Sequence, residues 1–381
     1  MSISVKRVLF LIHDLCHGGA EKVLVNLVNN MSPEKFDITV QTLFDVGVHR
    51  DKLKPHVHYK ACFRHMLRGN SHFMKLFSPG LLYRALIREE YDIVISYLEG
   101  PPARIISGCP YPSPKVCWLH IELNDEKAVA SGFRSYQEAV RCYQKYDQLV
   151  AVSETVKQTF CGSSGIQPDQ IRVLYNTNET NQIQELAKLP VDDVVFEKDV
   201  LSICSVAKIT PTKGYDRLAR VHKRLMEEDL KHHIYILGVG EQQEEIEAYL
   251  RANHLENSFT FLGFRDNPYK YVAKCDLYVC SSLREGFSTA VTEALIVGTP
   301  VVSTLCSGAK ELLGENDEYG VVVENSEEGI YQGMKRMLLE PELLRHYTSQ
   351  ARQRGQYFST ENTVAAVAEM LESLSRKKDR F

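Results

Sequence analysis

Short apolar runs alternate with stretches of helical periodicity along almost the whole chain. In the first half, runs of apolar and β-branched residues predict buried strands at 7–12, 36–44, 91–98, 115–120, 147–153 and 171–176. An amphipathic helix is predicted from about Ala20 to Asn30, and helical stretches separate most of the later strands. Strands that are apolar throughout and alternate with helices are typical of a parallel sheet covered on both faces.

The pattern stops in the middle of the chain and then restarts. Residues 178–199 are polar and acidic, and we expect them to connect two domains, 1–177 and 200–356. Within the second domain, apolar runs predict strands at 200–206, 233–238, 259–263, 276–281 and 300–304, and three helical stretches end the chain. The fold prediction is therefore α/β, with two doubly wound parallel-sheet domains facing across a cleft. In such sheets, ligands bind at the carboxyl ends of the strands.

Length and composition agree with a two-domain globular protein. The 381 residues are too many for one compact domain, and 44% hydrophobic with 25% charged residues is an ordinary composition. The net charge of −4 gives no general affinity for nucleic acid. The apolar run after Lys6 and Arg7 is too short for a signal peptide or a membrane span, so we expect a soluble, cytoplasmic protein. The ten cysteines form no Cys-x-x-Cys pair and the histidines show no metal-ligand spacing, so no metal site is expected.

Two lysines stand in the loop that follows the strand at 200–206. Lys208 and Lys213 are five residues apart and lie at the predicted ligand edge of the second sheet. Two cations at that place suit a pyrophosphate group. Their spacing alone is equally compatible with two solvated surface lysines.

The stretch REGFSTAVTEALIVGTPVV, at 284–302, follows another strand of the same sheet. Gly286 would let a ligand approach the backbone, and Ser288 or Thr289 can cap the helix that begins there. The free N–H groups and the dipole of that helix favour an anion. Glu285 and Glu293 would repel a phosphate but accept hydrogen bonds from hydroxyl groups, so the pattern indicates a ligand with hydroxyls on both sides of a diphosphate. A nucleotide sugar has this structure; a helix cap beside a surface glutamate is the alternative explanation.

These motifs resemble the paired-glutamate motif of the retaining GT-B glycosyltransferases in the large family 4 group. The order KITPTKG, LGVG, FLGF and REGFSTAVTEALIVGTPVV carries the resemblance through about residues 200–305, and HGGAE at 17–21 extends it to most of the chain. The resemblance implies a GT-B fold with two Rossmann-like domains, in which the first binds the acceptor and the second binds the donor. It also implies that the final helix, at about 357–381, packs back on the first domain.

The resemblance implies roles for the residues of the second domain. Glu293 would bind the ribose hydroxyls, and Glu285 would contact hydroxyls of the transferred sugar. Lys208 and Lys213 would neutralise the diphosphate leaving group, although the family usually has Gly-Arg where this chain has Ala207-Lys208. Backbone N–H groups for the sugar and diphosphate would come from Gly286, Phe287 and Ser288.

Five further residues are implied to lie around the donor. Gly18 and Gly19 would bring the first helix of the N-terminal domain to the diphosphate. His120, at the end of a strand, matches the active-site histidine of the family. Phe264 and Arg265 would lie beside the base.

The implied reaction transfers a hexose or N-acetylhexosamine from a nucleotide sugar, most commonly UDP-linked, to an acceptor hydroxyl with retention. No Asp-x-Asp motif occurs, so the lysines and helix N-termini would replace a metal ion, and no cofactor is expected. The acceptor would be a glycan or lipid-linked glycan of cell-surface polysaccharide, capsule or lipopolysaccharide assembly. A nucleotide-sugar 2-epimerase and a non-catalytic sugar-nucleotide or glycan-binding protein are the alternatives.

A basic segment in the first half suggests a membrane contact. Residues 52–88 contain eight Lys or Arg and no Asp or Glu, and Met, Leu and Phe are interleaved with them. Such a segment could dock on the anionic inner face of the plasma membrane and admit a lipid-linked acceptor. The alternative is a solvated loop and helix whose apolar residues lie in the core.

Overall fold

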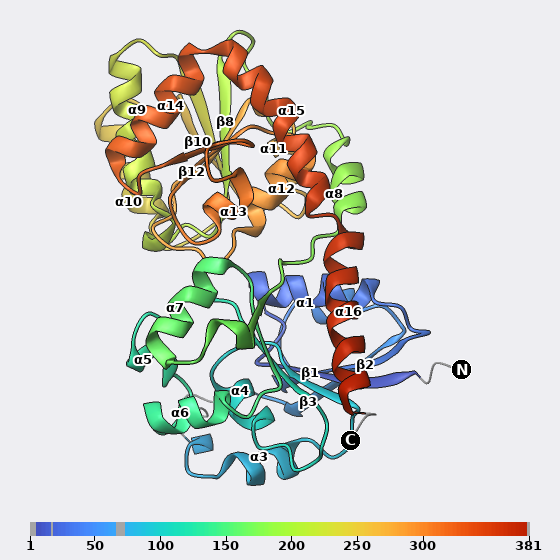
Figure 1. Cartoon of the computed structure of the whole chain (residues 1–381). Coiled ribbons are helices and arrows are strands. Elements are labelled where there is room, and N and C mark those ends of the chain that lie inside the picture. The colour runs from blue at the N-terminus through green and yellow to red at the C-terminus, as the bar shows by residue number, and fades with distance from the viewer. Residues whose placement is uncertain (1–4, 17, 66–72, 379–381) are drawn as a thin grey trace. The chain divides into compact units, whose positions relative to one another are not determined.

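The computed structural model describes residues 5–16, 18–65 and 73–378, and the chain divides into two compact units (Figure 1). The N-terminal unit comprises Met1–Asn178 together with Thr360–Phe381, and the C-terminal unit comprises Glu179–Ser359. The N-terminal unit is therefore built from both ends of the sequence.

In the described part of the N-terminal unit, seven strands form one parallel sheet in the order β3-β2-β1-β4-β5-β6-β7. The side chains from Val8 to Ile12 in the inner strand β1 (Lys6–Ile12) are fully buried, as expected for a strand covered on both faces. The other strands are β2 (Phe36–Phe44), β3 (Val57–Phe63), β4 (Ile93–Ser96), β5 (Lys115–Leu119), β6 (Gln148–Ala151) and β7 (Ile171–Val173).

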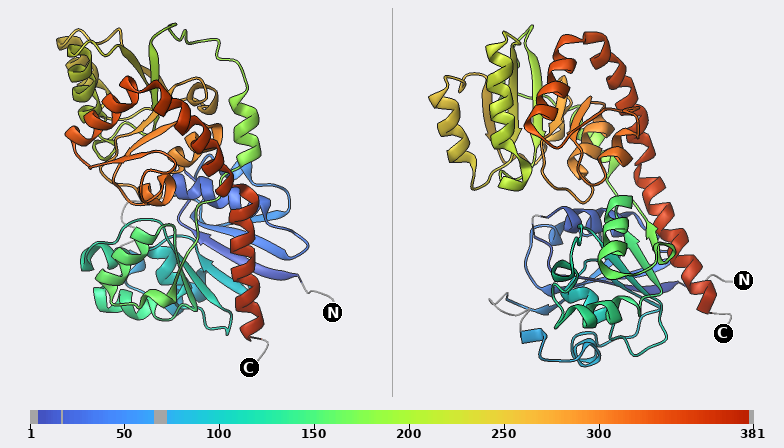
Figure 2. Two further views of the ribbon diagram at one scale, coloured as in Figure 1. Left: turned by 45° about the horizontal axis from the view of Figure 1, so that its top comes forward. Right: turned by 60° about the vertical axis from the view of Figure 1, so that its left-hand side comes forward.

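Helices cover this sheet, and the last helix of the chain is one of them. Figures 1 and 2 show α16 (Thr360–Lys378) running along the N-terminal unit, where it contacts α1 (Gly19–Asn30). An ion pair of 2.9 Å between Lys35 Nζ and Glu372 Oε1 fastens it. The remaining helices are α3 (Pro79–Leu86), α4 (Pro101–Ile106), α5 (Glu126–Val129), α6 (Tyr136–Tyr143) and α7 (Glu154–Ser164), with short 3₁₀ turns η1 (Arg50–Lys52) and η2 (Pro168–Gln170).

The C-terminal unit repeats this architecture with a second parallel sheet. Across its described residues, six strands take the order β10-β9-β8-β11-β12-β13. The chain runs outward from β8 to β10 on one side and from β11 to β13 on the other, so the order reverses between β8 and β11. The strands are β8 (Leu201–Val206), β9 (His232–Leu237), β10 (Phe259–Gly263), β11 (Leu277–Cys280), β12 (Val301–Thr304) and β13 (Val321–Val323).

The helices of the C-terminal unit pack on its sheet with amphipathic faces. In α9 (Tyr215–Glu227), for example, Leu218, Val221 and Leu225 are buried in the core cluster of this unit. The others are α8 (Thr180–Ala187), α10 (Gln243–Ala252), α11 (Tyr269–Val272), α12 (Thr289–Val297), α13 (Ala309–Leu313), α14 (Glu327–Leu339) and α15 (Pro341–Tyr357), with the 3₁₀ turn η3 (Pro211–Lys213). None of the helices traced in the described ranges has both the length and the apolar character required for a bilayer span.

The predicted α/β fold with two doubly wound parallel sheets is confirmed, and each strand predicted from an apolar run is present. Two edge strands were not predicted. β3 lies inside the basic segment 52–88, where the sequence suggested a loop and a helix. Its side chains are mostly partly buried or exposed, so it has no continuous apolar run. β13 has only three residues.

The stretch at 178–199 also differs from the simple connection that was predicted. Its first part forms α8, which packs on α11 and α12 of the C-terminal unit. Ile183 is buried there against Tyr269 and Ile296. A short amphipathic helix of this kind reads as polar in sequence because only one narrow face is apolar.

Candidate active site

The candidate donor site lies where the order of the C-terminal sheet reverses. β8 and β11 are neighbours, so the loops that follow them meet at the carboxyl edge of the sheet. Leu283 N donates to Thr212 O at 2.8 Å, and Ser281 Oγ donates to Lys213 O at 2.9 Å. The loops after β8 and β11 are thus hydrogen-bonded to each other, although Lys213 and Ser281 are 68 residues apart along the chain.

A carboxylate is held between a cation and a hydroxyl at this edge. Lys213 Nζ lies 2.7 Å from Glu285 Oε1, and Ser282 Oγ donates to the same oxygen at 2.6 Å. All three side chains are mostly shielded from solvent. Sequence reasoning placed Lys213 and Glu285 in one site but missed both their direct pairing and Ser282. The position of a serine three residues before the glutamate is the only signal that could have suggested it.

The second glutamate of the motif lies on the helix that follows. Ser288 caps α12, and its Oγ accepts a hydrogen bond from Val291 N at 3.4 Å. Glu293 is buried on this helix, and Tyr269 OH donates to its Oε1 at 3.4 Å. The structure thus has the predicted cap on α12, and Tyr269 is a partner of Glu293 that the motif did not indicate.

Buried side chains pack against the turn between Glu285 and Ser288 and fix its conformation. Phe287 is buried and its ring meets that of Phe358 at 5.7 Å, so its side chain is an anchor and only its backbone could face a ligand. Gly308, at φ +76°, lies against it, and a Cβ there would come within 2.8 Å of the Phe287 ring. Gly286 is only partly buried. Close packing of Gly308 thus fixes the turn.

A buried arginine that was not predicted holds the same loop. Arg217 donates from Nε and Nη2 to Ser281 O at 3.0 and 2.6 Å, and from Nη2 to Asn325 Oδ1 at 2.7 Å. Asn325 Nδ2 in turn donates to Leu283 O at 3.0 Å. Nothing in the sequence marks Arg217 except its place on the face of α9 that is otherwise buried.

The other predicted donor residues of this unit lie in the loops after β8 and β10. Lys208 is exposed in the loop after β8. Phe264 is exposed directly after β10. Arg265 forms an ion pair of 3.0 Å with Asp193, and its guanidinium lies 5.7 Å from the Tyr271 ring centroid. The positions of Phe264 and Arg265 beside a base remain a prediction.

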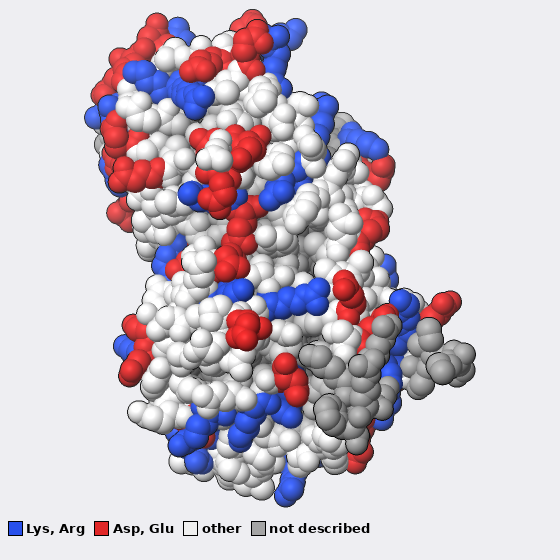
Figure 3. Space-filling view, in the orientation of Figure 1, with Lys and Arg blue, Asp and Glu red and all other residues white. Residues whose placement is uncertain are grey.

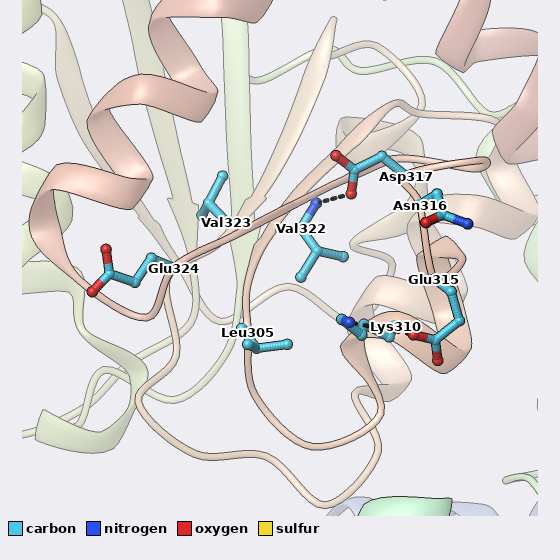
Figure 4. Close-up of a pocket in the computed structure, with 8 residues that line it drawn as sticks. All are labelled: Leu305, Lys310, Glu315, Asn316, Asp317, Val322, Val323 and Glu324. Carbon is cyan, nitrogen blue, oxygen red and sulfur yellow. Dashed lines mark hydrogen bonds and ion pairs between the residues drawn. The ribbon is translucent and has the colours of Figure 1, made fainter.

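A separate hollow lies beside the edge strand β13 and contains none of the predicted residues (Figure 4). Its volume is about 330 Å³. Its side chains are already engaged, since Lys310 pairs with Glu315 at 3.3 Å and Asp317 Oδ1 accepts from Val322 N at 2.9 Å. It is lined by Leu305, Lys310, Glu315, Asn316, Asp317, Val322, Val323 and Glu324.

In the N-terminal unit, the first helix begins with a pair of glycines after β1. Gly18 caps α1, and the Glu21 carboxylate folds back over it, so that a Cβ at Gly18 would lie 1.9 Å from Glu21 Oε2. A side chain at Gly19 would meet nothing within 4 Å. Gly18 therefore makes room for Glu21, and Gly19 keeps the N-terminus of α1 open.

His120 directly follows β5 at the same edge of this sheet, two strands away from β1. It is 8% exposed, and its backbone N–H donates to Glu99 Oε2 at 2.9 Å. Burial lowers the pKa of the His120 imidazole to about 3, although a hydrogen bond with the backbone of Tyr97 opposes this. Its Nε2 is buried without a partner among the described residues. A neutral imidazole with a free acceptor nitrogen suits a sugar hydroxyl.

Glu99, which follows β4, was not predicted as a site residue. Burial raises the pKa of its carboxyl group, hydrogen bonds from backbone N–H groups lower it, and the charge of Glu21 raises it further. Among the described residues there is no group of three or more His, Cys, Asp or Glu that could hold a metal ion.

The family models and the relatives that match this chain are all glycosyltransferases. The model for "Glycosyl transferases group 1" matches residues 192–354, and the model for "Glycosyltransferase Family 4" matches residues 17–182. A protein of Campylobacter jejuni is 30% identical over 363 residues, which cover 91% of this chain and 94% of that protein. Its name is N-acetylgalactosamine-N,N'-diacetylbacillosaminyl-diphospho-undecaprenol 4-alpha-N-acetylgalactosaminyltransferase.

Solved structures share the fold at lower identity. The crystal structure of Anabaena Alr3699/HepE in complex with UDP has a TM-score of 0.76 and 18% identity, and the match covers 96% of this chain and 100% of that one. The apo form of the lipopolysaccharide outer core galactosyltransferase WaaB has a TM-score of 0.71 and 17% identity, with 96% and 99% covered. The implied GT-B fold is thereby confirmed.

Proposed function

The chain belongs to the family 4 glycosyltransferases of the GT-B fold, and from this premise we propose that it moves a hexose or N-acetylhexosamine from a UDP-sugar to an acceptor hydroxyl with retention. The observation that carries the donor part is the arrangement at the β8–β11 edge. Lys213 pairs with Glu285 there, Ser288 caps α12, and Glu293 is buried on that helix. One cation and one helix N-terminus suit a diphosphate, and the two carboxylates suit hydroxyls on either side of it.

The proposed chemistry relies on position and charge more than on an acid or a base. Lys213 and the N-terminus of α12 would stabilise the charge that develops on the departing diphosphate. That diphosphate would take the proton from the attacking hydroxyl on the same face of the sugar, which gives retention. His120 would stay neutral and accept a hydrogen bond at Nε2, because its lowered pKa excludes a cationic form near neutral pH. We propose that no metal ion is required.

The donor and acceptor proposals draw on the relatives. Complexes of the Anabaena protein contain UDP or UDP-glucose. The Campylobacter relative is named for an acceptor that carries a diphospho-undecaprenol lipid, and a structural neighbour is named for the lipopolysaccharide outer core. We therefore propose a lipid-linked glycan as acceptor and cell-surface polysaccharide or lipopolysaccharide assembly, at the inner face of the plasma membrane, as the setting. Named relatives are transferases, so neither an epimerase nor a binding protein is favoured.

A thermal-shift panel tests the donor site directly. UDP, GDP, ADP and CDP are added in the presence of EDTA to the wild type and to Glu293→Ala. A ligand at 100 times its dissociation constant adds about 2.7 kcal/mol, which for a unit of this size corresponds to roughly 5 to 10 °C. We expect UDP to shift the wild type and not the variant. A second panel replaces EDTA with Mg²⁺: if no nucleotide raises the midpoint in either panel, the donor site is wrongly assigned, and if a shift occurs only with Mg²⁺, the metal-independent part is wrong.

The stereochemical part has its own test. Once a donor is identified, NMR of the first-formed product gives the anomeric configuration of the new bond. An α-linked donor should give an α-linked product, and a β-linked product would refute retention.

A further inference from the structure

Two cysteines lie beside the candidate donor site, at the ends of neighbouring strands of the C-terminal sheet. Cys280 is the last residue of β11, where it pairs in register with Ser303 of β12, and Cys306 follows β12. The chain turns between the end of β12 and Cys306, since Cys306 N donates to Thr304 O at 2.8 Å. The thiols of Cys280 and Cys306 share a hydrogen bond across the two strands.

The side chain of Thr304 fixes this turn on the loop that follows β11. Its Oγ1 donates to Ser282 O at 2.6 Å and lies 3.3 Å from Cys280 O. Cys280 is buried, whereas Cys306 is partly exposed. Two sulfur atoms that are held in contact on a fixed backbone need only a small movement to reach the length of a disulfide bond, about 2.05 Å.

The shared hydrogen bond makes the two thiols chemically unequal. The hydrogen bond with Cys306 lowers the pKa of Cys280 to about 7, although burial acts to raise it. The same hydrogen bond and burial both raise the pKa of Cys306. The thiolate is the reactive form of cysteine, so Cys280 supplies the nucleophilic sulfur and Cys306 holds a second thiol beside it.

A chain of hydrogen bonds joins this dithiol to the candidate donor carboxylate. The Cys280 thiol donates to Ser282 Oγ at 3.6 Å, and Ser282 Oγ donates to Glu285 Oε1 at 2.6 Å. Gly308, two residues beyond the second cysteine, lies against the Phe287 ring of the donor turn. A change at the two sulfur atoms therefore affects both a partner of Glu285 and the packing of its turn.

The charges that follow Cys306 in the chain are mostly negative. Residues 305–318 contain four Asp or Glu and one lysine, Lys310, which pairs with Glu315 at 3.3 Å. Figure 3 shows acidic side chains gathered over the part of the C-terminal unit that carries α13. A negative potential repels anionic reagents and not neutral ones, so a small neutral oxidant such as hydrogen peroxide suits this dithiol.

We propose that Cys280 and Cys306 form a peroxide-reactive dithiol whose disulfide weakens nucleotide binding at the donor site. The Cys280 thiolate attacks hydrogen peroxide, so that an S–O bond forms, the O–O bond breaks and the released hydroxide takes up a proton and leaves as water. The Cys306 thiol then attacks the sulfenic acid on Cys280, so that the S–S bond forms, the S–O bond breaks and a second water leaves with the thiol proton. The peroxide is reduced by two electrons, the two thiols are oxidised to one disulfide, and an added thiol reverses the change.

The effect on nucleotide binding rests on the proposed function. The disulfide removes the Cys280 S–H group that donates to Ser282, and it draws the turn after β12 toward β11. We expect UDP binding to weaken by about tenfold, a factor within the usual range of coupling between two sites.

Peptide mapping tests the dithiol without any nucleotide. The reduced full chain is treated with hydrogen peroxide, its remaining thiols are alkylated in denaturant, and its peptides are analysed by mass spectrometry. We expect a disulfide that joins Cys280 to Cys306 in the wild type and in Cys161→Ala. Cys161 is a matched control because it is also a partly exposed cysteine. The disulfide should be absent from Cys306→Ala.

A second thiol pair in the same map gives an internal comparison. Cys204 and Cys275 also share a hydrogen bond, but both are buried. We expect this pair to stay reduced while the first pair is oxidised. The dithiol inference is wrong if Cys280 and Cys306 stay reduced, or if they are oxidised no faster than Cys204 and Cys275.

UDP titration before and after oxidation tests the coupling. Oxidised wild type should bind UDP about tenfold more weakly than reduced wild type, and dithiothreitol should restore the affinity. Cys306→Ala should bind UDP equally well before and after peroxide treatment. Because coupling is reciprocal, saturating UDP should shift the equilibrium toward the two thiols by the same factor in a buffer of 2-mercaptoethanol and its disulfide.

The possible failures can be told apart. If the reduced protein binds UDP but the disulfide does not form, the dithiol inference is wrong and the proposed function stands. If the disulfide forms and UDP affinity does not change, the proposed effect on the donor site is wrong. If the reduced protein binds no UDP, the proposed donor site and its coupling fail together, whereas the peptide map still decides whether the dithiol reacts with peroxide.

Discussion

Arg217, on α9, holds the loop after β11 at the candidate donor site, and its replacement by methionine is a direct test of how that site is built. The substitution keeps much of the side-chain volume but removes the guanidinium group that binds Ser281 O and Asn325 Oδ1. It leaves a buried carbonyl group without its donor. Arg220 on the same helix is a matched control, because it is 43% exposed and pairs with Glu327 at 2.7 Å at the surface.

The expected loss follows from the contacts. Hydrogen bonds from a charged group contribute about 1.5–3 kcal/mol each, they are not additive here, and an unsatisfied buried carbonyl costs about 1–3 kcal/mol. We expect Arg217→Met to lower the free energy of unfolding by about 3–4 kcal/mol. An exposed ion pair contributes about 0–1 kcal/mol, so Arg220→Met should change little.

Stability alone would not show that Arg217 positions the donor loop, so the assay has two parts. Denaturant unfolding measures the free energy of unfolding. Nucleotide titration, at a temperature where all variants are folded, measures the affinity of the donor site. We expect Arg217→Met to weaken nucleotide binding by tenfold or more, and Arg217→Lys to restore part of it through one hydrogen bond. If Arg217→Met unfolds more easily but binds nucleotide like Arg220→Met, the residue is structural and the reasoning about the loop is wrong.

Three further predictions concern other contacts. Lys213→Met removes the cation proposed to face the diphosphate, so the transfer rate should fall by about 100- to 1000-fold in a donor-saturated assay; a change of less than tenfold would place the diphosphate elsewhere. Burial lowers the pKa of His222 to about 2 and that of His232 to about 4, so both are neutral when folded and take up protons below pH 6.5 when unfolded. The contribution of these two histidines to the free energy of unfolding should be fully present above pH 6.5 and fall by about 4 kcal/mol between pH 7 and pH 5. His222→Asn should remove about half of this pH dependence, as measured by urea unfolding at both pH values. Gly308→Ala adds a Cβ 2.8 Å from an aromatic ring at φ +76°, so it should lower the unfolding free energy by about 1–3 kcal/mol and weaken UDP binding; unchanged binding would show that the turn beneath the site tolerates movement.

The sequence predicts the interior of both sheets because a strand covered on both faces must be apolar throughout. The runs that became β1 and β12 are of this kind, and they were placed to within a residue or two. The edge strand β3 was not predicted, since its sequence VHYKACF mixes charged and apolar residues as a half-exposed strand does. The apolar pattern of a segment therefore identifies a strand when the strand is buried on both faces, but not when it is only partly buried.

The sequence predicted those residues of the candidate site whose positions follow from the order of the strands. Loops after neighbouring strands meet at the sheet edge, which brought Lys213 and Glu285 together correctly. The partners that hold them came from elsewhere in the chain, as with Arg217 and Tyr269. Such long-range pairs leave no periodic signal, because a single polar residue on a buried helical face looks like any other interruption of the apolar pattern.

The two units place their candidate residues at equivalent points but give them different electrostatic character. In the C-terminal unit, the β8–β11 edge carries a cation paired with a carboxylate beside a capped helix N-terminus. In the N-terminal unit, the corresponding edge around β1, β4 and β5 carries His120, which burial keeps neutral, and Glu99, whose carboxyl pKa is raised. The cation and the helix N-terminus of the C-terminal edge suit a diphosphate, whereas the neutral imidazole of the N-terminal edge can accept a hydrogen bond from a hydroxyl group. A paired cation beside a helix N-terminus at one edge and a buried neutral imidazole at the other thus support the proposal that the C-terminal unit binds the nucleotide-sugar donor and the N-terminal unit binds the glycan acceptor.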